Sequence, residues 1–268
     1  MTIDTDLPPA PPVPPLGSTP RTTLTRLPDR AATDRAMLND LLDEALLAHI
    51  AFADDGQPVV LPIACWRAGD HLYIHGARKT RFMQVLADGA PASVAVTVLD
   101  GLVIARSTFN HSMNYRSAII FGRFEPVDDP VAKAAALDAF MRHVVPGRDP
   151  HEPRPGSDQE LKATHVLRIA LDEVSVKWRA GPPGDQPQDM DRPVWAGVVP
   201  LALTAGTPIT APPPPPARCR RICRLSPPIR VCQRLSRRLR LRLKTASRKM
   251  HCKLRGAALP PLCRDSTR

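Results

Sequence analysis

The sequence contains no uninterrupted apolar run of the about 18–20 residues that a membrane-spanning helix requires. It also lacks a secretory signal, because no basic segment followed by an apolar stretch opens the chain, and Asp4 and Asp6 lead directly into proline-rich sequence. A disulfide framework is excluded for most of the chain, since the first 201 residues hold one cysteine, Cys65. These absences favour a soluble protein of the cytoplasm.

Aromatic residues are scarce, at 4% of the chain, and all of them precede residue 202. Acidic residues are almost missing after that point, because residues 202–268 carry 14 arginines and 3 lysines against the single acid Asp265, a net charge of +16. The first 201 residues therefore carry a net charge of −5, although the whole chain carries +11. The basic character belongs to the tail and does not indicate that the folded part binds nucleic acid.

Composition divides the chain into three segments. Residues 1–23 form a leader with repeated proline pairs, for which we expect an extended, disordered chain. Residues 24–210 have the apolar periodicity of a folded domain. Residues 211–268 form a tail rich in proline, arginine and cysteine, and its cysteines lack the paired spacing of a zinc site, so no metal is expected.

Two explanations of the tail stay open. Its arginine- and leucine-rich stretch at 234–242 could be an amphipathic element that meets nucleic acid or anionic lipid. Alternatively, the proline run at 212–216 implies a cytosine-rich coding tract, where reading frames slip. We favour the second explanation, in which the tail is an out-of-frame product or a disordered appendage.

Hydrophobic periodicity predicts six or seven strands joined mainly by short hairpins. A helix capped by Thr33 or Asp34 should precede them, with Asp54-Asp55-Gly56 and Asp100-Gly101 as hairpin turns. Further helices are expected at 82–88, 130–143 and 157–163, and strands at 50–53, 58–66, 71–75, 93–99, 102–105, 117–124 and 166–178. The frequent short turns favour a mainly β protein, an antiparallel β-barrel with peripheral helices, over a doubly wound parallel sheet.

The stretch from His71 to Gly89 organises the predicted domain. A strand with apolar Leu72 and Ile74 ends at Gly76, and a helix begins after the basic turn Ala77-Arg78-Lys79-Thr80-Arg81. The first N–H groups of a helix have no partner within it, and the helix dipole favours an anion there, so this turn is a candidate phosphate site. The alternative is a solvated basic turn without a ligand.

Three motifs occur in order along the chain: His75-Gly76-Ala77-Arg78-Lys79-Thr80-Arg81, then Met113-Asn114-Tyr115-Arg116-Ser117 with Phe121-Gly122, and then Glu160-Leu161-Lys162-Ala163-Thr164. Together they resemble the pyridoxamine 5′-phosphate oxidase-like flavin-binding proteins, in particular the flavin-nucleotide-binding branch related to nitroimidazole-resistance proteins. The resemblance runs from about Leu24 to about Thr210. It implies an FMN-binding split β-barrel that forms a homodimer, with FMN in a groove at the subunit interface.

The resemblance also implies which residues hold the cofactor. The matching positions are Pro62, Ile63 and Ala64 along the flavin ring, Gly76, Ala77, Arg78, Lys79, Thr80 and Arg81 around the phosphate, and His75, Asn114, Tyr115, Arg116, Lys177 and Trp178 around the rest of the cofactor. His75 is the one candidate for a catalytic group, because it matches a histidine that faces the flavin in the nitroimidazole-resistance branch. Relatives often carry glycine or small hydroxyl residues at 77–79, so the side chain that grips the phosphate stays open.

Several of these residues have an alternative structural role. His75 could be satisfied by a neighbouring strand, and Tyr115 could pack. Arg116 could pair with a surface acid, and Trp178 could plug the barrel. Cys65 is expected to be a small buried hydrophobe, since no base near it in the sequence suggests a nucleophile.

The expected function is that of an FMN-dependent oxidoreductase acting on an unknown small molecule, with the flavin carrying out the electron or hydride transfer. Oxidation of pyridoxamine phosphate is not expected, because the arginine- and tryptophan-bearing ending that holds that substrate is missing, and Trp195 lies in a different context. The alternatives are a flavin carrier or sensor without turnover, a relative that uses a deazaflavin or haem, and a nucleic-acid-binding protein that acts through its tail.

Overall fold

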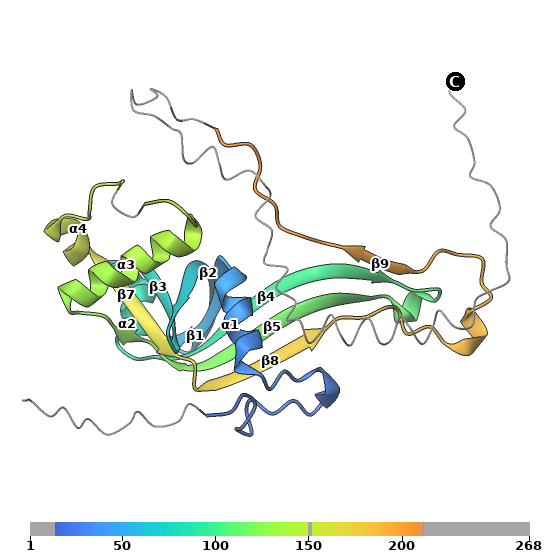
Figure 1. Ribbon diagram of the computed structural model, residues 1–268. Helices are drawn as coiled ribbons and strands as arrows, with labels where there is room; N and C mark the ends of the chain where they lie inside the picture. The colour runs from blue at the N-terminus through green and yellow to red at the C-terminus, as the bar shows by residue number, and fades with distance from the viewer. Residues whose placement is uncertain (1–13, 150–151, 210, 212–268) are drawn as a thin grey trace, which may run out of the picture.

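The computed structural model describes residues 14–149, 152–209 and 211 (Figure 1). The predictions for residues 1–13 and for the tail beyond residue 211 lie outside the described residues. The helices are η1 (Pro28–Arg30), α1 (Arg35–Glu44), α2 (Arg81–Ala87), η2 (Thr108–Asn110), α3 (Pro130–Val144), α4 (Asp158–Ala163) and η3 (Pro187–Asp189). The strands are β1 (Leu47–Asp54), β2 (Gln57–Ala68), β3 (His71–Ala77), β4 (Pro91–Ile104), β5 (Ser112–Arg123), β6 (Glu125–Pro126), β7 (Thr164–Ala170), β8 (Glu173–Arg179) and β9 (Gly197–Pro200).

The strands form one curled antiparallel sheet. Eight of them follow in the order β6-β7-β3-β2-β1-β4-β5-β8, and β9 adds to β4. The sheet curls around α1 and α2, with α3 on its other side, which is the arrangement of a split β-barrel (Figure 1). The expectation of a mainly β, antiparallel split barrel with peripheral helices is confirmed, and the described residues contain nine strands where six or seven were predicted.

The predicted hairpin turn at Asp100-Gly101 is wrong. Strand β4 continues through both residues and pairs with β5 on either side of them, with a β-bulge between Leu99 and Gly101. The expected turn would need a positive φ at the glycine, which Gly101 does not have. Instead, two hydrogen bonds from the Arg116 guanidinium hold the Asp100 carboxylate, so Asp100 is tied to the neighbouring strand and does not close a turn.

The predicted long strand at 166–178 is two strands. β7 ends at Ala170 and pairs with β3, whereas β8 begins at Glu173 and pairs with β5, so consecutive strands join opposite ends of the sheet order. No glycine or proline marks the change of direction in the sequence. The backbone N–H of Leu171 donates to Asp70 O at 2.9 Å, a contact between segments that sequence periodicity does not register.

The main core lies between the sheet and the first two helices. Asp34 caps α1 as predicted by accepting a hydrogen bond from Ala36 N, and the spacing of Leu38, Leu41 and Leu42 turns one face of the helix to the sheet. Further buried residues of this core are Ile50, Cys65, Leu72, Ile74, Met83, Leu86, Val94, Ile120, Leu167 and Val174. The first two predicted helices are therefore confirmed, and both lie on the concave side.

A second, smaller core lies on the other side of the sheet, under α3. Trp66 of β2 is fully buried there, with Val166 of β7 and Ala136 of α3. Tyr73 and Phe140 pack against this group, and their rings lie 5.6 Å and 5.1 Å from that of Trp66. The helix α3 therefore covers the part of the outer side formed by β2, β3 and β7.

The packed chain begins before residue 24, within the segment that the sequence assigned to the disordered leader. Leu16 and Thr22 are buried, and Gly17 N donates to Val174 O at 2.9 Å. Ala32 N donates to Val176 O at 3.0 Å further along the same strand. Residues 14–32 thus satisfy backbone groups on the edge of β8, which would otherwise be the open edge of the sheet.

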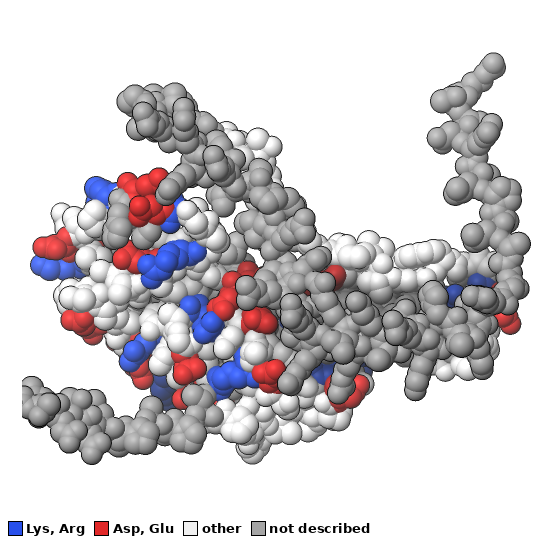
Figure 2. Space-filling view, in the orientation of Figure 1, with Lys and Arg blue, Asp and Glu red and all other residues white. Residues whose placement is uncertain are grey.

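Strands β4, β5, β8 and β9 extend beyond the barrel as a long arm (Figure 1). Figure 2 shows acidic and basic side chains gathered over the barrel, while the arm presents a stretch of uncharged surface. Within the described residues, no helix is long and apolar enough to cross a membrane.

Candidate cofactor-binding site

The basic turn between β3 and α2 has the strand-to-helix form that the sequence predicted. Thr80 stands at the N-cap of α2, although its hydroxyl makes no capping hydrogen bond. The turn is held by two backbone bonds, from Arg78 N to Ala163 O at 2.8 Å and from Thr80 N to Ala77 O at 3.0 Å. Arg78 and Lys79 project from a turn that is anchored to the end of α4.

Arg81 is already occupied by two carboxylates. Its guanidinium donates to Asp54 at 2.6 and 2.9 Å and to Asp55 at 2.8 Å, in the tight turn that joins β1 to β2. The hydrogen bonds and charge of Asp54, followed by those of Asp55, raise the pKa of the exposed Arg81. Because two acids neutralise its charge, Arg81 positions the turn against the β1–β2 hairpin and is a poor candidate for holding a phosphate.

Arg78 and Lys79 differ from Arg81 in this respect. Both are exposed, and neither forms an ion pair with any described carboxylate. The expected phosphate site is therefore reduced to these two cations. Arg78 also lies near His165, where burial first and then the charges of Arg78 and Lys133 lower the pKa of the imidazole.

Beside this turn, β2 has an open edge. Residues 57–64 of β2 pair with β1, while β3 pairs only with residues 65–68, so the described structure leaves the other edge of 57–64 unpaired. The pairing of β2 with β3 ends at Cys65 and Ile74, and from there the two strands diverge. The turn at 77–80 follows the end of β3, on the side of β2 where Pro62 and Ala64 have no partner strand. The unpaired backbone groups of residues 57–64 and the side chains of Arg78 and Lys79 thus lie on the same side of β2.

The side chains on the convex side of this sheet form what we call the outer face. Residues paired directly across strands point to the same side, and the pairing places Leu47, Val60, Leu99, Met113 and Val199 together on it. Each of these side chains is between 38% and 61% exposed. The small residues Ala51, Ala64, Ser93, Ala95 and Ser117 lie between them. Within the described residues, much of this side of the sheet outside the area under α3 is therefore apolar and partly exposed.

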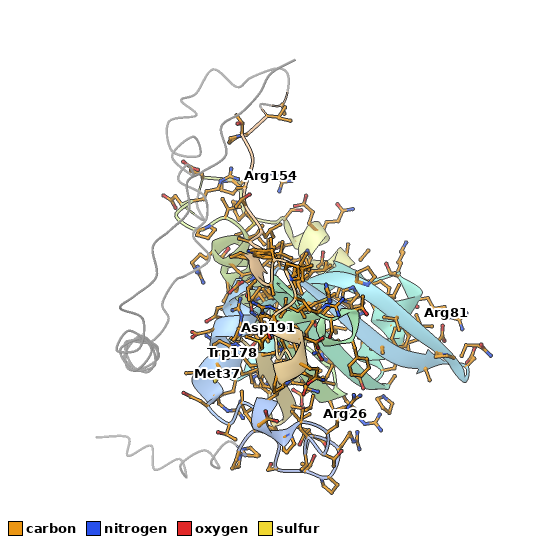
Figure 3. All side chains as sticks on the ribbon, turned by 90° about the vertical axis from the view of Figure 1, so that its right-hand side faces the viewer. Arg26, Met37, Arg81, Arg154, Trp178 and Asp191 are labelled. Carbon is orange, nitrogen blue, oxygen red and sulfur yellow. The ribbon has the colours of Figure 1, made fainter. Side chains whose placement is uncertain are left out.

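The same pairing divides the predicted cofactor residues. Pro62, Ala64, His75, Ala77, Tyr115 and Lys177 lie on the outer face, whereas Ile63, Gly76, Arg116 and Trp178 lie on the core side. Figure 3 shows Trp178 well apart from Arg81, which lies at the edge of the molecule. The structure therefore gathers some of the predicted cofactor residues on the outer face and places the others on the opposite, core side of the sheet.

His75 lies in the aromatic group under α3. Its ring centre is 4.6 Å from that of Phe140 and 5.8 Å from that of Trp66, and its Nδ1 is buried without a hydrogen-bond partner among the described residues. Burial lowers the pKa of the imidazole, so the neutral ring is favoured. These contacts are those of a packed side chain, and α3 lies between His75 and the open part of the outer face.

Arg116 and Asn114 have structural partners. Arg116 donates to both oxygens of Glu44 at 2.6 and 2.9 Å and to both oxygens of Asp100 at 2.9 and 2.7 Å. Burial works against its charge, but the hydrogen bonds and charges of the two acids outweigh it and raise the pKa of Arg116. Asn114 donates to Gly181 O and accepts from Gly181 N and Arg179, so it fastens the loop after β8.

Cys65 is buried, free and part of the main core. Burial raises the pKa of its thiol to about 12, which keeps it in the un-ionised form at neutral pH. The prediction that Cys65 is a small buried hydrophobe is confirmed.

Two exposed histidines were missed as cofactor candidates at the sequence level. His49 stands on the outer face, paired with Pro62 and Ala95, and the alternation of buried and exposed residues along β1 could have located it. His111 follows η2 at the tip of the arm. Its side chain is held by a backbone carbonyl, a contact that no sequence pattern signals.

The curled antiparallel sheet, with its open edge beside a basic turn, is the architecture of split β-barrel flavin-binding proteins. A family model described as pyridoxamine 5′-phosphate oxidase matches residues 34–178, more than half of the chain. The chain therefore belongs to the pyridoxamine 5′-phosphate oxidase family, as its motifs indicated.

Two solved structures are similar over most of their length. The FAD and haem binding protein from Mycobacterium smegmatis is 45% identical, with 69% of this chain and 90% of that chain covered and a TM-score of 0.66. The flavocytochrome Anf3 from Azotobacter vinelandii is 36% identical, with 74% of this chain and 92% of that chain covered and a TM-score of 0.69. A search of curated proteins gave no match.

Proposed function

We propose that this chain is a flavin- and haem-binding redox protein that acts as a homodimer, with the flavin against the open edge of β2. The observation that carries this proposal is the juxtaposition of three features that a flavin needs. These are unpaired backbone groups at 57–64, the two cations Arg78 and Lys79 at the end of that edge, and an uncovered apolar face. The residues present therefore fit the group.

Each part of the chain would contribute one contact. The free edge of β2 would hydrogen-bond the polar rim of the flavin ring, and Ala64 and Pro62 would lie against the ring. Arg78 and Lys79 would hold the phosphate, because no described carboxylate neutralises them. When bound, the flavin supplies hydride or electron transfer, and the protein supplies binding and orientation.

The flavin proposed here is FAD in preference to the FMN expected from the sequence. A relative 45% identical is described as binding FAD and haem, and a second at 36% is described as a flavocytochrome. A haem also corresponds to one of the alternatives left open by the sequence. His75, the one base proposed from the sequence, packs under α3 against Phe140, so we favour electron transfer by the flavin over proton transfer at this side chain.

The homodimer follows from the size and character of the outer face. In the described part of the chain Leu47, Val60 and Leu99 are 48%, 61% and 38% exposed on one surface, and a second copy would present the same surface to cover it. Such a dimer would place the flavin between subunits. Sedimentation of the full chain at two concentrations is expected to give twice the mass of 29.3 kDa at both, and a monomer at both would contradict this part of the proposal.

The binding experiment begins with the absorbance spectrum of the purified full chain. The bands of oxidised flavin and the Soret band of haem are both expected, and chromatography after denaturation should release FAD. A colourless protein that neither FAD nor FMN reconstitutes would contradict the proposal. Release of FMN would retain the flavin site and overturn the preference for FAD.

A double variant, Arg78→Ala with Lys79→Ala, tests the site directly. Loss of two hydrogen bonds to an anion, at roughly 1.5 kcal/mol or more each, should weaken flavin binding by about 100-fold. The matched control is Arg26→Ala with Arg142→Ala, which removes the same charge from exposed positions with no described carboxylate partner. Equal flavin affinity in the two double variants would remove the β3–α2 turn from the site.

Reoxidation kinetics distinguish a redox enzyme from the alternative, a flavin carrier without turnover. Bound flavin is reduced by light and then challenged with candidate acceptors. Reoxidation no faster than that by dissolved oxygen would favour the carrier.

A further inference from the structure

The geometry points to His111, at the tip of the arm, as the residue that would bind the iron of a haem. This inference rests on the proposed function, because it concerns the haem of that proposal. It goes beyond it by naming the iron-binding residue and by placing the haem on the arm, away from the edge of β2.

The first observation is the hydrogen bond that orients the imidazole. His111 follows the short helix η2, and its Nδ1 lies 2.9 Å from the carbonyl oxygen of Ser107. A carbonyl oxygen can only accept, so Nδ1 carries the proton and the neutral ring keeps its lone pair on Nε2. Metal-binding histidines commonly donate their second N–H to a backbone carbonyl in this way, which fixes both ring orientation and tautomer.

The other described histidines lack this combination of a fixed tautomer and an exposed free nitrogen. His143 uses Nε2 itself to contact Ala45 O at 2.8 Å, and His75 is enclosed by aromatic rings. His165 is buried, while His49 and His71 have no hydrogen bond to orient the ring. Within the described part of the chain, His111 is thus the histidine whose ring is oriented with an exposed Nε2 free to bind a metal ion.

The second observation is the apolar surface around His111. Phe109, two residues before it, is 95% exposed, and Met113, two residues after it, is 51% exposed. Trp195 is also largely exposed and precedes β9, which pairs with β4 beside the tip, Gly197 opposite Ile104. A flat macrocycle bound through Nε2 would cover such side chains, which water otherwise contacts.

A third observation concerns the propionates. Arg179 donates to Asn114, to Gly181 O and to Pro182 O, and no described carboxylate neutralises it. Burial and the nearby Arg30 lower the pKa of Arg179, which reflects a cation without a counter-charge. Tyr115, its partner across the strands, lies four residues after His111, which immediately precedes β5, a span of about 13 Å in an extended chain. A haem on the arm can therefore place a carboxylate toward this end of β8.

The test uses the full chain, hemin as the probe, and four proteins: the unmodified chain, His111→Ala, His49→Ala and Phe109→Ser. Hemin titration followed at the Soret band gives affinity and ligation, and flavin absorbance in the same sample reports the other site. His111→Ala is expected to bind hemin at least tenfold more weakly, with a shifted Soret band that added imidazole restores, and with unchanged flavin content. His49→Ala should bind hemin with the affinity and Soret band of the unmodified chain, and Phe109→Ser should lose hemin affinity without a spectral shift.

Three results would overturn the inference. One is a His111→Ala protein with the affinity and spectrum of the unmodified chain. Another is loss of haem in His49→Ala with retention in His111→Ala, which would place the iron on the outer face. The third is an unmodified chain that binds flavin but takes up no hemin. That result removes the haem from the proposed function, and it is distinct from the first two because the unmodified chain itself fails.

Discussion

Replacing Arg116 with methionine separates a structural role from a cofactor role for this residue. The guanidinium makes four hydrogen bonds to Glu44 and Asp100, and the three side chains are 16%, 17% and 32% exposed. Arg116→Met leaves two carboxylates half-buried and adjacent without a counter-charge. Removing one partner of a buried pair costs about 3–5 kcal/mol, and the partial exposure of Asp100 argues for the lower end, about 3 kcal/mol.

That loss is a large part of the roughly 5–15 kcal/mol that stabilises a typical domain. Urea unfolding of the flavin-free chain, followed by tryptophan fluorescence, measures it. The matched control is Arg67→Met, because Arg67 also makes a two-pronged contact with a carboxylate, Asp43, but at an exposed site where less than about 1 kcal/mol is expected. Neutralising both acids with Glu44→Gln and Asp100→Asn in the Arg116→Met background should recover much of the loss.

The outcome decides the role of Arg116. Equal destabilisation by Arg116→Met and Arg67→Met would refute the reasoning about the buried charges. Flavin affinity per folded molecule should be unchanged in Arg116→Met, since the side chain lies on the core side of the sheet. A flavin affinity that falls while the stability holds would return Arg116 to the cofactor site.

Three further predictions concern the core and the arm. A thiol reagent at pH 8 should leave Cys65 unmodified in the folded chain, because burial raises its pKa to about 12. Compared with the unmodified chain, Cys65→Ala should therefore show the same number of reactive thiols when folded and one fewer after denaturation. Because burial lowers the pKa of His75 from its ordinary 6.5, the unfolded chain binds more protons below that pH, so stability should fall as pH drops through 6.5; it should fall less in His75→Phe, and identical pH profiles would contradict this. A Cβ at position 101 would lie 3.0 Å from Val199 O, so Gly101→Ala should displace β9 and speed proteolysis near 197–200; Gly76→Ala, whose Cβ would meet the flexible Met83 side chain, should leave that cleavage rate unchanged.

Local patterns predicted much of the fold because their causes are local. Asp34 caps α1 as predicted, and Ser157 and Glu160 form a capping box at the start of α4, where a helix was predicted, since both are contacts within a few residues of the chain. The turn at 77–81 was located for the same reason. The Asp100-Gly101 turn failed because Arg116, sixteen residues away in the sequence, binds the aspartate and keeps the strand extended.

The predicted cofactor set shows the same limit. The sequence gathered Arg78, Lys79 and Arg81 into one basic turn, but it could not show that Asp54 and Asp55 of another hairpin neutralise the third of these cations. It identified His75 by its motif, but the strand alternation alone does not say which side α3 covers. Contacts across segments decide both points.

The sequence alone determined the family, the antiparallel β class, the first helices and the basic turn. The reason is that the order of the motifs, the alternation of apolar and polar residues and the helix-capping contacts each depend on residues that are close in the sequence. Only the tertiary structure decided which residues share a face. Strand pairing places Pro62, Ala64, Tyr115 and Lys177 on the outer face and Arg116 and Trp178 on the other side. The reason is that side chains alternate across a strand, so the register between strands sets which residues meet, and that register depends on the packing of the whole sheet.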